Sequence, residues 1–404
     1  MHSVAALRPG LHSTRLIGVR DHPAREPQSM TTIIPARSAQ KFLSVLPHVC
    51  GYVPRLSLVV VPIVDGRTAG VARLDLPQDE EAWGEVAATA LGIVCRLPDA
   101  GRFAAVVYTD DPFVDRDGAI AFEGFMGYLR ERADHCGVEV VDALCVAADG
   151  WGSYLDDPSP EHGRPLDEIA FEGALPEGVE PTPVRADQGD GAELPACDLA
   201  EKERLGRALA EIDRACAALG SDGDESGIAG IHPRALATAC LLGQIPEVFE
   251  ESLAWDVEAL EPYLAGAVAW ALNRPFFRDV ALSQWSADIE EGYETLAFNE
   301  RWRAGHRAEP TGPVRLMGEG PRPDADRLER ALELVRRLAA AAPREARVGP
   351  LVAAAWLSWA LGRATHAARY VALVAEIDPE HGLASIIASM LEASYLPPWA
   401  FERP

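Results

Sequence analysis

Residues 51–77 constrain the fold most, because they predict two strands joined by a tight turn. Leu56–Val61 is a nearly continuous apolar run rich in β-branched residues, which is typical of a strand buried on both faces. Pro62 is expected to end that strand, and the Asp-Gly pair at 65–66 is a strong signal for a hairpin turn. The chain is then expected to return as a second strand over Thr68–Leu76.

Strands and helices alternate around this hairpin. A short helix that Ser38 caps and Pro47 ends is expected before it. The following apolar patterns predict, in order, a helix, a strand, a helix and a strand over Gln78–Arg96, Arg102–Tyr108, Gly118–Cys136 and Val138–Ala147. Such an order favours parallel pairing with helical crossovers. With the hairpin added, the sequence predicts a mixed, mostly parallel sheet flanked by helices.

The rest of the chain has a different pattern. Gly, Pro, Asp and Glu dominate residues 156–196, which predicts a loop or linker. Residues 197–404 show helical periodicity almost throughout. The overall fold class is therefore α/β in the first domain and α+β for the whole chain, with an α/β domain over 30–155 and an all-helical domain over 197–404. Residues 1–29 are expected to be a disordered extension or a misassigned start.

The charge balance excludes some partners. Sixty-two acidic residues against 37 basic ones give a formal net charge of −25, and the arginines are interspersed with Asp and Glu. Duplex binding needs a clustered basic surface, so neither nucleic acid nor an anionic membrane is expected as a direct partner. Lysine occurs only at Lys41 and Lys202, which indicates a GC-rich genome.

No cofactor or metal motif is found. The seven cysteines include no Cys-x-x-Cys pair, and the ten histidines form no His-x-x-x-His or His-Glu-x-x-His pair. Glycine-rich phosphate loops and the Gly-x-Ser-x-Gly motif of hydrolases are missing as well. No apolar run approaches the length of a membrane span, and the first 29 residues lack the apolar core of a secretion signal. The expected location is the cytoplasm, with no bound metal and no cofactor.

A candidate ligand site follows from strand direction, since ligands of open α/β sheets gather at the carboxyl ends of strands. The residues expected at these ends are Arg73, Asp75, Thr109, Asp110, Asp111, Trp151, Ser153 and Tyr154. The carboxylates there could share a magnesium ion or act as general acid and base. The alternative is that the acidic residues form an ordinary solvated turn, while the aromatic residues anchor a loop on the core.

Several segments carry a resemblance to a known family. They are Met30-Thr-Thr-Ile-Ile-Pro-Ala-Arg-Ser38, Gly51-Tyr52-x-Pro54-x-x-Ser57-Leu58-Val59, Arg73-x-Asp75-Leu76-Pro77, Tyr108-Thr109-Asp110, Trp151-x-Ser153-Tyr154, and Gly362 through Asp378-Pro379. Together they resemble an uncharacterised actinobacterial family, domain of unknown function 4192. The resemblance covers most of the chain after Met30 and implies no particular activity.

A helical hairpin is expected at residues 350–395. Gly362, Ala367 and Asp378-Pro379 stand at the spacing of one tetratricopeptide unit. Because about three such units are usually needed for a stable array, one unit predicts a hairpin that completes a helical domain. Trp359 and Tyr370 would contact a partner if they were exposed.

Two functions remain open from the sequence. The first is a non-enzymatic binding or adaptor protein that uses its helical domain to hold a protein partner. The second is an enzyme or sensor for a small phosphorylated metabolite, with its site at the carboxyl ends of the strands. The missing catalytic motifs favour the first.

Overall fold

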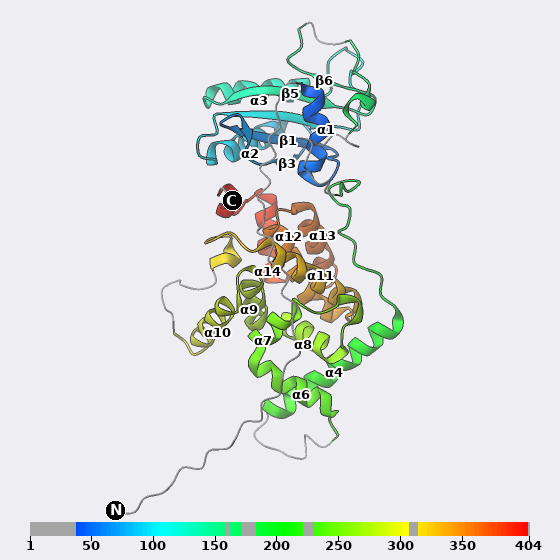
Figure 1. Ribbon diagram of the computed structural model, residues 1–404, viewed down its shortest axis with the longest axis vertical. Coiled ribbons are helices and arrows are strands. Elements are labelled where there is room, and N and C mark those ends of the chain that lie inside the picture. Colours follow the sequence, from blue (N-terminus) through cyan, green and yellow to red (C-terminus); the bar gives the residue numbers. More distant parts are fainter. Residues whose placement is uncertain (1–37, 158–160, 171–182, 221–229, 307–313, 403–404) are drawn as a thin grey trace, which may run out of the picture.

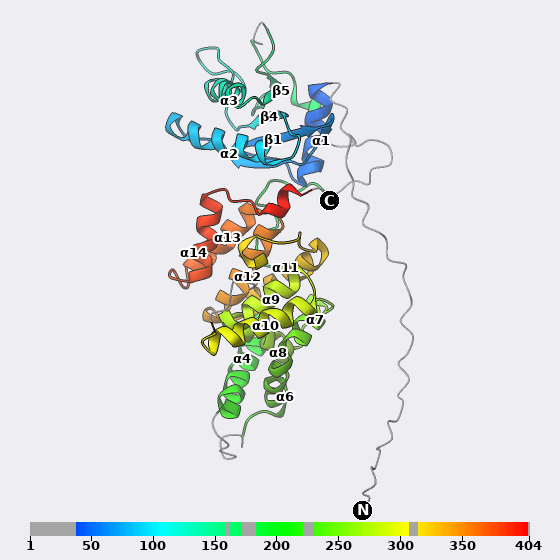
Figure 2. The same cartoon turned by 90° about the vertical axis from the view of Figure 1, so that its left-hand side faces the viewer.

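The structure is a computed structural model that describes residues 38–402, except 158–160, 171–182, 221–229 and 307–313. The extension predicted for residues 1–29 lies outside the described residues. Within the described residues, the strands lie between residues 57 and 153, in what we call the sheet part (Figures 1 and 2). The described elements from Leu199 to Phe401 are helices, and we call this the helical part.

The first helix, α1 (Ala39–Cys50), begins as expected and ends later than expected. The Ser38 hydroxyl accepts a hydrogen bond from the backbone N–H of Lys41 at 3.2 Å, which caps the helix. Pro47 does not end it and lies inside its last turn. The helix ends instead at Gly51, whose φ of 76° suits a residue without a side chain.

The hairpin forms as β1 (Ser57–Val64), β2 (Arg67–Thr68) and β3 (Ala72–Asp75), with the Asp-Gly turn where it was predicted. The expectation that Pro62 ends the first strand is wrong, because β1 runs through it. The Pro62 carbonyl accepts a hydrogen bond from Ala69, in the short gap between β2 and β3. Pro62 has no N–H to donate, but the side of β1 on which that donor would lie faces the gap between β2 and β3. No hydrogen bond of the sheet is therefore lost.

The sheet is mixed, as predicted, but it is not mostly parallel. The strands β4 (Arg102–Tyr108), β5 (Glu139–Val146) and β6 (Trp151–Ser153) complete the order β2-β1-β4-β5-β6, with β3 also paired to β1. Among the described strands, only β4 and β5 pair in parallel. The predicted helix between β3 and β4 does connect two strands that run in the same direction. These strands are not neighbours, because β1 lies between them and is antiparallel to both.

Helices cover both faces of the sheet. On one face, α2 (Trp83–Arg96) and α3 (Glu123–His135) pack on side chains that include Leu58, Phe103 and Val107. On the other face, α1 packs on the alternate residues of the same strands, and these include Val59 and Val106. Both faces of β1 and β4 are therefore dry, which explains their continuous apolar sequences.

The described residues of the helical part are all-helical, as predicted, with one main core cluster and a small second cluster around Ala215, Ala235 and Ala239. Its helices are α4 (Leu199–Gly220), α6 (Pro233–Leu241), α7 (Ile245–Ser252), α8 (Pro262–Leu272), α9 (Pro275–Ser286), α10 (Ile289–Arg303), α11 (Ala325–Ala341), α12 (Val348–Ala360), α13 (Ala364–Ala375) and α14 (Gly382–Glu392). Short 3-10 turns include η3 (Leu242–Gln244) and η7 (Pro398–Phe401). The helices α9 and α10 are separate, because the Asp288 carboxylate accepts a hydrogen bond from the backbone N–H of Glu291 and starts α10.

The second half of the predicted linker, from residue 183 onward, contacts both parts. Arg185 exchanges backbone hydrogen bonds with Gly51 and Val53 of the sheet part. Further on, the carbonyl of Ala196 accepts a hydrogen bond from Arg337 of α11 at 2.6 Å. A cation–π contact between Arg96 of α2 and the ring of Phe401, 5.6 Å from the ring centroid, joins the two parts a second time.

Candidate functional site

The carboxyl ends of β3, β4 and β5 lie at one edge of the sheet. The strand register runs from Asp75 to Ser57, Tyr108, Val146 and Trp151 across neighbouring strands. The structure places Asp75, Thr109, Asp110, Asp111 and Trp151 at this edge, while Arg73 pairs with Val59, two residues inward. Ser153 and Tyr154 also lie inward, beside Leu144 and Ala143, because β6 runs back antiparallel to β5. What they do there depends on their partners.

Arg73 links the sheet to the helical part. Its Nε donates to the Ser57 hydroxyl at 2.7 Å and its Nη1 donates to the Thr365 hydroxyl of α13 at 3.3 Å. It also forms an ion pair with Asp75. The Arg73 side chain is only 14% exposed, whereas Asp75 is 84% exposed. The guanidinium is therefore committed to partners within the chain on three sides.

The acidic turn after β4 is held by its own contacts. Asp110 forms an ion pair with Arg55 at 2.7 Å, and this hydrogen bond raises the pKa of the Arg55 guanidinium. The buried Thr109 hydroxyl donates to the Asp111 carboxylate at 3.2 Å and accepts from the Asp111 backbone N–H at 3.1 Å. Both contacts are those of a side-chain-stabilised turn.

The aromatic residues of the third strand end are anchors. Trp151 is 1% exposed, and its indole N–H donates to the Pro165 carbonyl at 3.1 Å. The Tyr154 hydroxyl donates to the Ala121 carbonyl at 2.6 Å. The Ser153 hydroxyl donates to the Ala143 carbonyl at 3.3 Å. Each polar tip is bound to the backbone, so these side chains fix the segment after β5 on the sheet.

Metal-ligating side chains do not gather in the described residues, where no group of three or more His, Cys, Asp or Glu side chains could hold an ion. The acidic residues at the strand ends point to separate partners instead.

A groove in the helical part was not predicted. It lies between η3, α9 and α10 and has a volume of about 500 Å³. Its lining combines apolar side chains with one acidic and one basic residue: Leu242, Gly243, Ile245, Phe276, Phe277, Leu296, Glu300, Arg303 and Ala304. Glu300 and Arg303 are exposed, while Phe276, Phe277 and Leu296 are half-buried.

Two phenylalanines of α9 line the groove, with a tryptophan of α8 and an arginine of α10 beside them. Phe276 and Phe277 meet edge to face at 5.0 Å, and Phe277 lies 6.0 Å from the ring of Trp270. The Arg303 guanidinium lies over Phe276 at 6.0 Å. The Asn299 amide of α10 donates to the Phe276 carbonyl at 2.8 Å, which ties the two helices together. Aromatic residues and arginine are enriched at protein interfaces.

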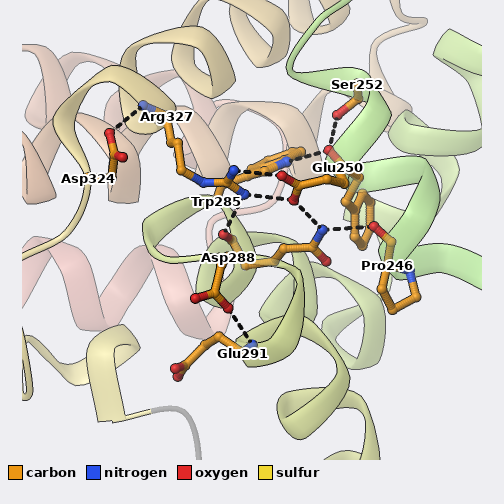
Figure 3. Close-up of polar contacts among 10 residues, drawn as sticks. Pro246, Glu250, Ser252, Trp285, Asp288, Glu291, Asp324 and Arg327 are labelled. Carbon is orange, nitrogen blue, oxygen red and sulfur yellow. Dashed lines mark hydrogen bonds and ion pairs between the residues drawn. The ribbon is translucent and has the colours of Figure 1, made fainter. Parts of the chain in front are cut away.

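A partly buried polar network holds α9 against its neighbouring helices (Figure 3). The two carboxylate oxygens of Glu250 accept from Arg327 at 2.6 and 2.7 Å, and one of them also accepts from Gln284 at 2.9 Å. Arg327 lowers the pKa of Glu250, and Glu250 raises the pKa of Arg327. The indole N–H of Trp285 donates to the Phe249 carbonyl at 3.1 Å. The network joins α7, α9 and α11.

The two residues proposed as partner contacts in the hairpin at 350–395 are buried. Trp359 is 3% exposed and Tyr370 is 0% exposed. Substituting either one would report lost packing and would not report binding.

The fold belongs to the α+β class, with a mixed sheet followed by a helical part. The family model described as "Domain of unknown function (DUF4192)" matches residues 40–310, about two thirds of the chain, and the protein belongs to this family. No curated protein and no solved structure matches the chain. Within the described residues, no helix is long and apolar enough to cross a membrane.

The family match contains the whole sheet part and the groove, but it stops before α11. The core of the helical part does not stop there. Buried residues from Leu205 to Trp285 and from Leu328 to Trp399 form one cluster. The segment after residue 310 therefore completes the core that holds the groove.

Proposed function

We propose that this protein is a non-enzymatic binding or adaptor protein, and that the groove between η3, α9 and α10 receives a protein partner. The observation that carries the proposal is the half-buried aromatic wall, in which Phe276, Phe277 and Leu296 line an open hollow of about 500 Å³. Anchor side chains of a partner typically insert into such hollows at the centre of an interface.

The chemistry of the lining indicates what the partner offers. An apolar side chain of the partner would occupy the floor, where burial of apolar area stabilises the complex. Glu300 and Arg303 would pair at the rim with groups of opposite charge, and such rim contacts mainly set orientation and association rate. The groove lies wholly inside the segment that matches the family, so this role is one that other members of the family could share.

The enzyme or sensor alternative is the weaker proposal. It needs free functional groups at the strand ends, yet Arg73, Thr109, Asp110 and Asp111 each have a partner within the chain. A thermal-shift screen with nucleotides, sugar phosphates and Mg²⁺ tests it directly. A shift that disappears in the Asp110→Asn, Asp111→Asn double variant would favour the alternative.

We further propose a cytoplasmic location in an actinobacterial cell, with neither nucleic acid nor membrane as a direct partner. All seven cysteines carry free thiols, which suits a reducing compartment. The net charge of −25 opposes contact with phosphate backbones and anionic lipids. We also propose that α12 and α13 form a hairpin that resembles one tetratricopeptide unit.

Charge reversal at the groove tests the proposed function. Arg303→Glu places a negative charge at the rim, and Arg301→Glu is the matched control, because it changes an exposed arginine two positions away that does not line the groove. Tagged wild-type protein and both variants are purified from the host, and co-purifying proteins are quantified. We expect one or more partners that wild type and Arg301→Glu retain and Arg303→Glu loses. Equal recovery by all three would contradict the proposal.

A further inference from the structure

A second surface lies on α14, away from the groove. The outer side of this helix carries a shallow hollow of about 440 Å³ lined by Ser385, Ile386, Ser389, Met390, Ala393 and Tyr395. Ile386 is 45% exposed, a high value for an isoleucine. Figure 2 shows α14 at the outer edge of the helical part, with α13 beside it.

The outer face is the uncovered side of a helical stack. On its inner side, Ala384 and Ile387 are buried in the core that includes α12 and α13. The helices α12 and α13 pack against each other, and α13 packs against α14. The outer face of α14 therefore stands where the next helix of such a stack would pack.

The charge pattern of this face points to a particular occupant. Glu392 is the one charged residue of α14, in a chain in which 99 of 404 residues (37 basic and 62 acidic) are charged. Two copies of a chain with a net charge of −25 repel each other, and a surface that is nearly free of charge adds least to that repulsion when two copies meet. A basic partner, by contrast, would find almost no counter-charge on this helix.

The shape of the face is self-complementary. Ser385, Ser389 and Ala393 stand four residues apart and form a row of small side chains. Ile386 and Met390 form a ridge of larger side chains beside that row. In an antiparallel pair of helices, the ridge of each copy would pack into the small-residue row of the other.

We infer that α14 is a homodimer interface, in which two copies pair antiparallel about a two-fold axis that passes near Ser389. Such an interface is isologous and closes at two subunits. Since one helix from each copy forms it, the buried area is small and the dimer is weak. This inference does not depend on the proposed partner groove.

Oligomeric state across concentration tests the inference. Sedimentation of the full chain from about 1 to about 200 μM should show a reversible monomer–dimer equilibrium. Ile386→Glu should remain monomeric throughout, because it places a charge in the interface. Leu219→Glu, a matched change at a 47% exposed residue of α4, should behave as wild type. A wild-type monomer at the highest concentration, or a dimer that Ile386→Glu leaves intact, would overturn the inference.

Two further measurements keep the test independent of any damage by the glutamate. Under mild oxidation, Ser389→Cys should form a covalent dimer, because each copy of the residue would face the other across the axis. Glu376→Cys, directly after α13, and the wild-type chain, with its native cysteines, set the background. Added salt should tighten the dimer by screening repulsion between the acidic chains. If the wild-type protein is a monomer that binds another protein, and Ile386→Glu abolishes that binding, then the face belongs to a different partner. That result would also overturn the inference.

Discussion

The edge of the sheet and the α9–α10 groove differ in how many of their side chains already bind partners within the chain. At the sheet edge, polar side chains converge from several strands, but Arg73, Thr109 and Asp110 bind partners within the chain. In the groove, few polar groups are present, and Phe276 and Phe277 lie half-buried around a hollow of about 500 Å³.

The difference teaches that position in the fold does not by itself identify a site. A strand end gathers polar residues partly because the turn that follows it needs hydrogen bonds of its own. A half-buried aromatic wall, in contrast, still has apolar area that a partner can remove from water. We therefore propose that binding occurs in the helical part and that the strand-end residues have structural roles.

The largest expected effect concerns the support behind the groove. Trp285 is 0% exposed in the core on which α9 packs. Trp285→Ala should lower the free energy of unfolding by about 3–5 kcal/mol, because it leaves a cavity and removes the indole hydrogen bond. Urea unfolding measures the loss. Trp302→Ala, at a 50% exposed tryptophan of α10, should cost much less. Equal losses of unfolding free energy in the two variants would show that the packing of Trp285 does not support the groove.

A smaller effect is expected from the ion pair in the same support. Glu250→Gln should lower the free energy of unfolding at pH 7 by about 2 kcal/mol, below the cost for a fully buried pair because Glu250 is 34% exposed. The folded-state pKa of Glu250 is lowered by Arg327, so its contribution is present above the unfolded-state pKa and is lost as pH falls through the folded-state pKa.

Urea unfolding of wild type and Glu250→Gln at pH 7 and at pH 3 measures this dependence. The stability difference between the two proteins should shrink as the solution becomes more acidic. A difference that stays constant, or grows, would mean that the carboxylate charge does not stabilise the support.

At the sheet edge, Arg73 should matter for stability alone. Arg73→Met removes the hydrogen bonds to Ser57 and Thr365 and should lower the free energy of unfolding by about 1–2 kcal/mol. Thermal unfolding measures this loss, and the partners recovered by affinity purification should not change. Loss of a partner by this variant, with its fold intact, would move the binding site to the sheet edge.

The smallest effect is expected at Asp110. Its ion pair with Arg55 joins side chains that are 54% and 55% exposed, and such surface pairs contribute little. Asp110→Asn should change the free energy of unfolding by less than about 0.5 kcal/mol. It should also leave the response to phosphorylated metabolites unchanged in a thermal-shift screen. A ligand-induced shift that this variant abolishes would restore the strand ends as a site.

Local patterns predicted most of the elements. The hairpin turn, the buried strand at Arg102–Tyr108 and the helix cap at Ser38 follow from short-range rules, and the structure confirms them. The predictions that Pro62 ends its strand and Pro47 ends its helix were wrong, because Pro62 lies beside a gap in the sheet and Pro47 lies in the last turn of its helix. Neither circumstance is visible in the neighbouring residues.

Long-range arrangement was harder to predict. The sequence indicated that β3 and β4 run in the same direction, but it did not reveal that β1 lies between them. Strand direction predicted that the ends of β3, β4 and β5 meet at one edge, but it did not predict that β6 runs back along β5 and carries Ser153 inward. Their partners, such as Thr365 for Arg73, come from distant segments and could not be predicted.

The groove escaped prediction for a related reason. No sequence pattern distinguished Phe276 and Phe277, whereas Trp359 and Tyr370 were considered as candidate contacts. The structure shows the first pair half-buried and the second pair buried. An aromatic residue in a helix has the same sequence signature in both situations. The Phe-Phe pair directly after Pro275, at the start of a helix, was the one available signal.

The most direct test of the central claim compares the two regions in living cells. A photo-crosslinking phenylalanine analogue is placed at Glu300 in the groove or at Asp110 at the sheet edge, both of which are exposed. After irradiation, covalent adducts are identified by mass spectrometry. The account predicts a protein adduct from position 300 and none from position 110. An adduct from position 110 alone, or from neither position, would contradict the claim that the groove holds the partner.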